Sequence, residues 1–466
     1  MTLPVLRSRW NGATITLELD RPLPPGARLA VTSMVVLAPH VVQLGTYHEL
    51  DPGALSELTV SHPPEHANDG PLSAFAILAD GSTSPIEVVP MTSTVAQPVA
   101  PVAPMTPLPE LTFTGEPAHA FRGLHLDLAR QWFEPDVVLR VLDAAAERRL
   151  THLHLHLTDD EAWRLPVAQY PARAEHGGTR GHGRRLPPML GGGASPAGRA
   201  YTPAEIGRWV THAAGLGIVL VPEVDLPAHN HAALTALPEL RDPDDTSHAR
   251  SVQFFTDNVL VPGLATTQRF LTAVVDTLAE LFPHSPHLHI GGDEVPAGAW
   301  RGSPTVRALQ AAHGWESVRE IEAHFHRELI ALIHARTGRH VGAWQEAAES
   351  GGMQPDDGYV VAWRTAADGQ ALAASGYDVV LAPGDAYYLD MALDARWDTP
   401  GMHWAGATSL ADVQAFAPGA GWTPSERARL LGVQACLWTE LVPDEATLWQ
   451  RLLPRLDAFA ERAWAG

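Results

Sequence analysis

"THLHLHLTDD", residues 151–160, is the stretch on which the interpretation of the fold rests. Leucine and histidine alternate through it, which is the period of a β-strand. Two carboxylates, Asp159 and Asp160, follow directly. Other short apolar segments of the chain are also followed by polar side chains, and helical segments separate most of them. The stretch therefore predicts one strand of a repeated strand–helix unit.

Seven further segments have the composition of buried strands: 121–130, 218–224, 287–290, 340–344, 358–363, 377–382 and 431–438. Amphipathic helices lie between most of them. The helix expected at 201–217 opens with a capping box from Thr202 to Glu205, which marks a helix start. Eight such strands close naturally into a parallel (β/α)8 TIM barrel, which we place at residues 115–466.

The first part of the chain has a different sequence pattern. Residues 13–20, "ATITLELD", alternate strictly, and similar segments with turn residues between them follow. We interpret 1–90 as a smaller β-rich domain, a β-sandwich, and the proline-rich segment 91–114 as a linker. Residues 174–200, rich in glycine and arginine, predict a long surface loop that could act as a lid.

Composition excludes several classes of function. The net charge of −21 over 466 residues argues against nucleic acid or an anionic membrane as a partner. The sequence has no lysine, which excludes Schiff-base chemistry. With Cys436 alone, no internal disulfide can form. We see neither a signal peptide nor an apolar run of roughly 18 residues, so we expect a cytoplasmic protein, whose oligomeric state stays open.

Polar and aromatic residues gather where the predicted strands end, and in a barrel these ends surround one mouth. Carboxylates, an arginine, a histidine and tryptophans in such a ring suit a neutral, hydroxyl-rich ligand. Any one of them alone could be structural, for example a helix cap. The set is Arg122, Asp159, Asp160, Glu223, Asp225, His229, Asp293, Glu294, Trp344, Trp363, Tyr388, Asp390, Trp438 and Glu440.

His152, His154 and His156 share one face of their strand. Histidines spaced in this way on a barrel strand can bind zinc or iron, so a metal-dependent hydrolase is an alternative. Such sites typically bridge their metals with a modified lysine, which this chain lacks. The carboxylates after the strand also place the mouth beyond the histidines, so we expect the three rings inside the barrel wall and no metal.

"HIGGDEV", residues 289–295, contains two adjacent carboxylates, Asp293 and Glu294. Most glycosidases hold two carboxylates about 5–5.5 Å or about 6.5–9.5 Å apart, across the scissile bond. Neighbours in an extended chain point in opposite directions and are poorly placed for that work. One of them, preferably Glu294, should be a general acid, and the other must do something besides act as a nucleophile.

This stretch resembles the H-x-G-G-D-E signature of glycoside hydrolase family 20, the β-N-acetylhexosaminidases. The resemblance covers about 115–466 and recurs in "FRGLHLDLAR", "HLHLTDDEAWR", "PEVDLPAHNHAAL", "GAWQE", "YYLDM", "HWAG" and "LWTE". It implies a cofactor-free, exo-acting enzyme that removes terminal N-acetylglucosamine or N-acetylgalactosamine. The substrate's own 2-acetamido oxygen would be the nucleophile, giving an oxazolinium intermediate and retention of configuration.

The resemblance also implies roles for residues. Glu294 would protonate the leaving oxygen and then act as the base for water. Asp293 would orient the acetamido group, and Tyr388 would donate a hydrogen bond to its oxygen. The substrate-binding set would be Arg122, Asp159, His229, Trp344, Trp363, Asp390, Trp404, Trp438 and Glu440. An inactive glycan-binding homologue is a further alternative.

Overall fold

The computed structural model describes residues 113–466, with gaps at 172–175, 182–183, 187–196, 254 and 397–398, together with residue 111. Before them it describes the backbone of eight strands between Leu6 and Pro90. The predicted linker, apart from residues 111, 113 and 114, and about half of the predicted 174–200 loop lie outside the described residues. Among the described helices, none has the length and apolar composition that a membrane span requires.

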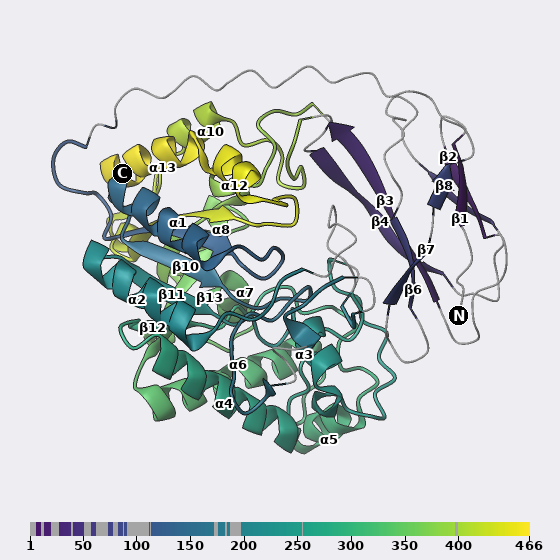
Figure 1. The fold of residues 1–466 in the computed structure, drawn as a ribbon. Coiled ribbons are helices and arrows are strands. Elements are labelled where there is room, and N and C mark those ends of the chain that lie inside the picture. The colour runs from purple at the N-terminus through teal and green to yellow at the C-terminus, as the bar shows by residue number, and fades with distance from the viewer. Residues whose placement is uncertain are drawn as a thin grey trace.

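Residues 121–437 contain a closed barrel of parallel strands, which confirms the predicted (β/α)8 architecture (Figure 1). All eight segments predicted as strands supply it. Each pairs in parallel with its neighbour along the chain, and the last pairs with the first. The strands are β9 (Phe121–Asp127), β10 (His152–His156), β11 (Val219–Glu223), β12 (His287–His289), β13 (His340–Trp344), β14 (Gly358–Ala362), β15 (Asp378–Leu381) and β16 (Leu430–Leu437).

Helices surround the barrel, and the predicted start signals are present. Thr202 and Glu205 form the expected capping box of α2 (Pro203–Leu216), and Gly217 ends it at φ +72°. The other helices are α1 (Pro135–Glu147), α3 (His231–Ala236), α4 (Ala265–Leu281), α5 (Pro304–His313), α6 (Val318–Thr337), α7 (Gln345–Glu349), α8 (Ala366–Ala374), α9 (Gly384–Tyr387), α10 (Leu410–Ala415), α11 (Pro424–Arg427), α12 (Glu445–Leu452) and α13 (Arg455–Ala465), with 3-10 turns η3 (Pro238–Leu240) and η4 (Pro355–Asp357).

The alternation in the strands separates two environments. Leu153 and Leu155 of β10 belong to the large apolar core that the strands share with the helices. The intervening His154 and His156 are fully buried and face the barrel interior, because successive side chains leave a strand on opposite faces. The interior is therefore polar on this side, whereas barrel interiors are usually filled by branched apolar residues.

The N-terminal strands form two four-stranded sheets of mainly antiparallel pairs, with the orders β5-β2-β1-β8 and β4-β3-β6-β7. They are β1 (Leu6–Trp10), β2 (Thr14–Leu19), β3 (Arg28–Ala38), β4 (Val41–Leu50), β5 (Glu57–Ser61), β6 (Ser73–Ile77), β7 (Thr83–Ile86) and β8 (Val88–Pro90).

The chain turns sharply where β12 ends. Gly291 and Gly292 have φ values of +66° and +97°, and Glu294 follows at +53°. This left-handed region costs a residue with a side chain about 1–2 kcal/mol. A Cβ atom at Gly291 would also overlap the Asp225 carboxylate. The Gly292 N–H donates to Asp225 Oδ1 at 3.0 Å, so the turn is fixed against the residues that follow β11.

We predict opposite effects for two glycine-to-alanine substitutions. At Gly207 in α2 a Cβ atom would meet nothing within 4 Å, so Gly207→Ala should raise the free energy of unfolding by about 1 kcal/mol. Gly291→Ala should lower it by about 2 kcal/mol or more. Thermal melting of both variants measures this, and equal melting temperatures would contradict the need for glycine in the turn.

Candidate active site

Asp293 and Glu294 face the same imidazole. His229 Nε2 lies 3.7 Å from Asp293 Oδ2 and 3.4 Å from Glu294 Oε2. Neighbours in a strand would point apart, but the left-handed backbone of Glu294 brings both carboxylates to one side. Asp293 is buried, whereas the Glu294 side chain keeps 25% of its surface exposed. The adjacent pair is thus a buried carboxyl group beside a more accessible one.

His229 connects this pair to a second buried carboxylate. Its Nδ1 atom lies 3.3 Å from Asp159 Oδ1, and Asp159 Oδ2 pairs with the Arg130 guanidinium at 2.9 Å. Burial alone would lower the pKa of His229, but Asp159 and Asp225 outweigh it and raise that pKa well above its usual value. His229 is therefore an imidazolium that presents an N–H group to carboxylates on both sides.

Asp293 and Asp225 are a pair of interacting carboxyl groups. Burial and then the neighbouring Asp225 raise the pKa of Asp293 well above its usual value. Burial likewise raises the pKa of Asp225 to about 7. Two buried carboxyl groups in contact share a proton, because two like charges there repel each other. Asp293 therefore holds its proton to higher pH than an isolated aspartate does.

Five aromatic residues predicted for the site lie together. The rings of Trp363 and Tyr388 stack with centroids 6.3 Å apart, and those of Trp344 and Trp438 lie 5.7 Å apart. Trp404 lies edge-on to Trp363 at 5.7 Å and is 56% exposed. Such surfaces suit the apolar faces of a sugar ring. Trp404 is the most exposed of the five.

Polar groups border the aromatic residues. The Arg130 guanidinium lies over the Trp438 ring, 4.9 Å from its centroid, and 4.0 Å from Glu440 Oε1. Asp390 Oδ1 accepts the backbone N–H of Trp438 at 3.5 Å. The second oxygens of Asp390 and Glu440 are buried without a hydrogen-bond partner among the described residues. They are acceptors available to hydroxyl groups of a ligand.

Arg122 was expected in this site, and the structure places it elsewhere. It lies at the amino-terminal end of β9, where its guanidinium donates to the carbonyls of His119 and Arg149 and lies over the Trp464 ring. Arg130, which follows β9, lies at the mouth instead. The strand-end rule used for the other residues would have selected Arg130, because only residues after the carboxyl end of a strand reach this face.

The three histidines of β10 lie inside the barrel wall, as expected. His152 stacks on Phe121 with ring centroids 3.9 Å apart, while His154 and His156 surround Glu223.

Four groups of three described residues have possible ligand atoms within 4.8 Å of one another: His125, His154 and Glu223; His156, Asp159 and Asp225; Asp159, Asp160 and His229; and Asp225, His229 and Asp293. Their imidazoles and carboxylates pair with one another, for example His156 Nδ1 with Glu223 at 2.6 Å, and we assign no metal to them.

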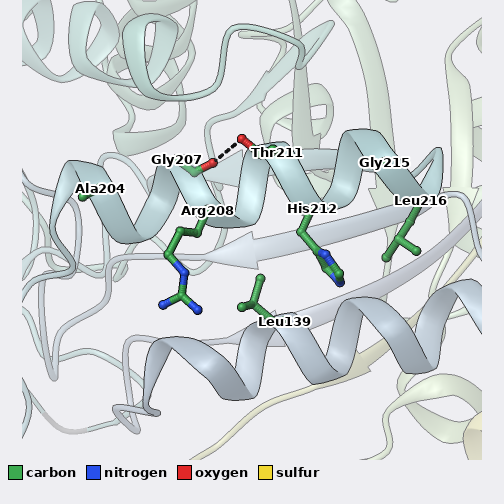
Figure 2. Close-up of a pocket in the computed structure, with 8 residues that line it drawn as sticks. All are labelled: Leu139, Ala204, Gly207, Arg208, Thr211, His212, Gly215 and Leu216. Carbon is green, nitrogen blue, oxygen red and sulfur yellow. Dashed lines mark hydrogen bonds between the residues drawn. The ribbon is translucent and has the colours of Figure 1, made fainter.

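A groove on the outer helices is separate from this site (Figure 2). It runs between α1 and α2 and is bordered by Arg208, which pairs with Asp136 at 2.7 Å, and by His212, which pairs with Asp143 at 2.6 Å. None of the predicted site residues lines it. The predicted site residues that lie together do so at the strand ends and not in this groove.

Comparison with known proteins agrees with this geometry. Residues 119–466 match the model of the glycosyl hydrolase family 20 catalytic domain. A β-hexosaminidase of Vibrio furnissii is 36% identical over 382 residues, which are 81% of this chain and 62% of that protein. The chain thus spans less than two thirds of that relative's length.

Solved structures show the same fold. The exo-β-N-acetylglucosaminidase of Vibrio harveyi in complex with N-acetylglucosamine superposes with a TM-score of 0.78 at 22% identity, covering 99% of this chain and 94% of that one. The β-N-acetylhexosaminidase of Streptomyces coelicolor superposes with a TM-score of 0.60 at 29% identity, covering 75% and 65%. From the match of its whole barrel to the family model, this chain belongs to glycosyl hydrolase family 20.

Proposed function

We propose that this chain is a retaining exo-β-N-acetylhexosaminidase whose nucleophile is the substrate's own acetamido oxygen. The proposal rests on one observation: the carboxylates of Asp293 and Glu294 both face His229. Carboxylates on one side of a site cannot attack a sugar from one face and protonate it from the other. A nucleophile supplied by the substrate removes that requirement. The ligand of the Vibrio harveyi structure, N-acetylglucosamine, carries such a group.

Glu294 protonates the leaving glycosidic oxygen and then removes a proton from the attacking water. Its partial exposure allows both the leaving group and the water to reach it. Asp293 accepts the acetamido N–H and, as a carboxylate, stabilises the positive charge that develops on the oxazolinium. Tyr388, buried next to Trp363, donates its hydroxyl proton to the acetamido oxygen. These contacts hold the nucleophile in a near-attack position.

Substrate binding divides between the aromatic residues and the polar border. Trp344, Trp363 and Trp438 enclose the acetamido group and the sugar ring, and Trp404 extends this surface toward the next sugar. The outer hydroxyl groups bind to Arg130, Asp390 and Glu440. Arg130 therefore takes the role first expected for Arg122. The substrates are glycosides with a terminal, β-linked N-acetylhexosamine.

Glu294→Gln should lower kcat by about 10²–10⁴-fold, the range lost with a general acid–base group, while the melting temperature stays near that of the wild type. Steady-state hydrolysis of a β-N-acetylglucosaminide measures this. Glu445→Gln, which alters an exposed pair with Arg140 and a hydrogen bond accepted from Trp449, is the matched control and should keep full activity. Near-normal turnover by Glu294→Gln would show that Glu294 is not the general acid–base residue.

Asp293→Asn should lower kcat by about 10²–10³-fold, because it removes the charge that stabilises the intermediate. A thiazoline analogue of that intermediate should inhibit the wild type tightly and the variant weakly. Inhibition constants for both proteins check this. Equal inhibition of the two would contradict the role of Asp293.

Asp225→Asn should shift the acid limb of the pH profile of kcat/KM to lower pH. A raised pKa keeps Asp293 neutral below that pKa, and the charged form that the reaction needs appears as the pH rises. Replacing Asp225 removes the like charge that helps to raise the pKa of Asp293, so the carboxylate forms at lower pH. An acid limb unchanged from the wild type would show that this pair does not control the profile.

A further inference from the structure

The polar side of the barrel interior is organised around one carboxylate, that of Glu223 at the end of β11. It is fully buried, and groups from three other strands converge on it. Oε2 lies 2.6 Å from His156 Nδ1 and 3.1 Å from His154 Nε2. Oε1 lies 3.0 Å from His289 Nδ1 and accepts the Trp344 indole N–H at 2.9 Å. His156, His289 and Trp344 hydrogen-bond to this carboxylate, and His154 makes an ion-pair contact with it.

One branch leads from Glu223 to the acid–base residue. His156 Nε2 lies 2.8 Å from Asp159 Oδ2. Asp159 Oδ1 lies 3.3 Å from His229 Nδ1, and His229 Nε2 lies 3.4 Å from Glu294 Oε2. Carboxylates and imidazoles thus alternate from the barrel interior to the mouth, through hydrogen bonds as far as His229 and through an ion-pair contact from His229 to Glu294.

The other branch leads to the aromatic residues. The Trp344 side chain is buried, and its indole N–H donates to Glu223. Its ring packs against Trp438 with centroids 5.7 Å apart. The rotation of the Trp344 ring, and so the shape of that side of the pocket, is set by the same carboxylate that binds His156.

The charges along the chain favour these contacts. Burial alone would raise the pKa of Glu223, but His156, His289 and His154 outweigh it and hold that pKa well below its usual value. Burial would lower the pKa of His156, but Glu223 and Asp159 raise it well above its usual value. His156 is therefore an imidazolium that donates from both nitrogens, which fixes the orientation of the Asp159 carboxylate.

We propose that Glu223 is a positioning residue that fixes two parts of the active site together, Glu294 through His156, Asp159 and His229, and the Trp344 wall directly. The inference rests on the proposed function for its kinetic consequences. Glu223 itself does not touch the substrate. A carboxylate is needed because it can accept from both branches, whereas an amide of the same shape must turn its NH2 group toward one of them.

Other charged and titratable groups face His156 and affect its protonation. They are His125 on β9, His154 on its own strand, Asp225 after β11 and His289 on β12, and Arg130 lies beyond Asp159. The imidazoles oppose a charge on His156, and Glu223 and Asp159 support it most. Removing the Glu223 charge should therefore bring loss of the His156 proton into the working pH range.

The direct test is the nitrogen-15 NMR signal of the His156 ring, assigned with His156→Gln and followed against pH in the wild type and in Glu223→Gln. We expect the wild-type ring to stay doubly protonated to higher pH than the ring in Glu223→Gln. This readout needs no substrate, so it stands even if the proposed activity is wrong. A His156 ring that is neutral at pH 7 in the wild type would overturn the proposal.

Kinetics test the two branches separately. His156→Gln should lower kcat by about 10–100-fold, a part of the acid–base contribution, with little change in KM. Trp344→Phe keeps an aromatic side chain but removes the indole N–H donor, and it should raise KM more than it lowers kcat. Glu223→Gln should both lower kcat and raise KM. The alkaline limb of its pH profile of kcat should move to lower pH. His152→Gln, on the same face of β10 but outside the chain, is the matched control and should change neither parameter.

A double-mutant cycle gives the final check. Glu223 and His156 act in series, so Glu223→Gln with His156→Gln should lose no more kcat than Glu223→Gln alone. Multiplied losses, or an alkaline limb unchanged in Glu223→Gln, would overturn the proposal. If Glu223→Gln does not fold, His156→Gln and Trp344→Phe are compared instead. The proposal expects the first to lower kcat and the second to raise KM. If both variants change the same kinetic parameter, Glu223 does not act on two separate parts of the site.

Discussion

The left-handed turn after β12 is the constraint on which the site depends. Gly291 and Gly292 allow the backbone to leave the barrel strand at positive φ, and Glu294, after Asp293, again has a positive φ. Without that turn the adjacent carboxylates would point in opposite directions. With it they face one histidine. Asp225 fixes the turn, because its carboxylate lies where a side chain at Gly291 would be and accepts the Gly292 N–H.

The barrel interior supports that arrangement in an uncommon way. Instead of layers of branched apolar side chains, the side formed by β9–β12 buries histidines around Glu223, while the other side, with Tyr359 and Val361, is apolar. Buried charges are costly unless they are paired and hydrogen-bonded, and here the Glu223 carboxylate has imidazole and indole partners. The interior therefore orients groups at the mouth as well as filling space.

Much of this was predictable from the sequence, because alternation and strand ends are local patterns. All eight barrel strands and the Thr202 capping box were recognised, and so was the position of Asp293 and Glu294. The prediction that Arg122 lies in the site was wrong, because the motif "FRGLHLDLAR" holds two arginines at opposite ends of one strand, and Arg130 is the one at the mouth. The role of Glu223 could not be predicted, since it depends on four groups from three other strands meeting one carboxylate.

The most direct test of the account compares two nitrophenyl β-glycosides, the N-acetylglucosaminide and the plain glucoside, under identical conditions with purified protein. The account predicts fast hydrolysis of the first and none of the second, because only the first carries the acetamido nucleophile. Comparable hydrolysis of both would mean that a protein group attacks the sugar. The roles given to Asp293 and Tyr388 would then be wrong.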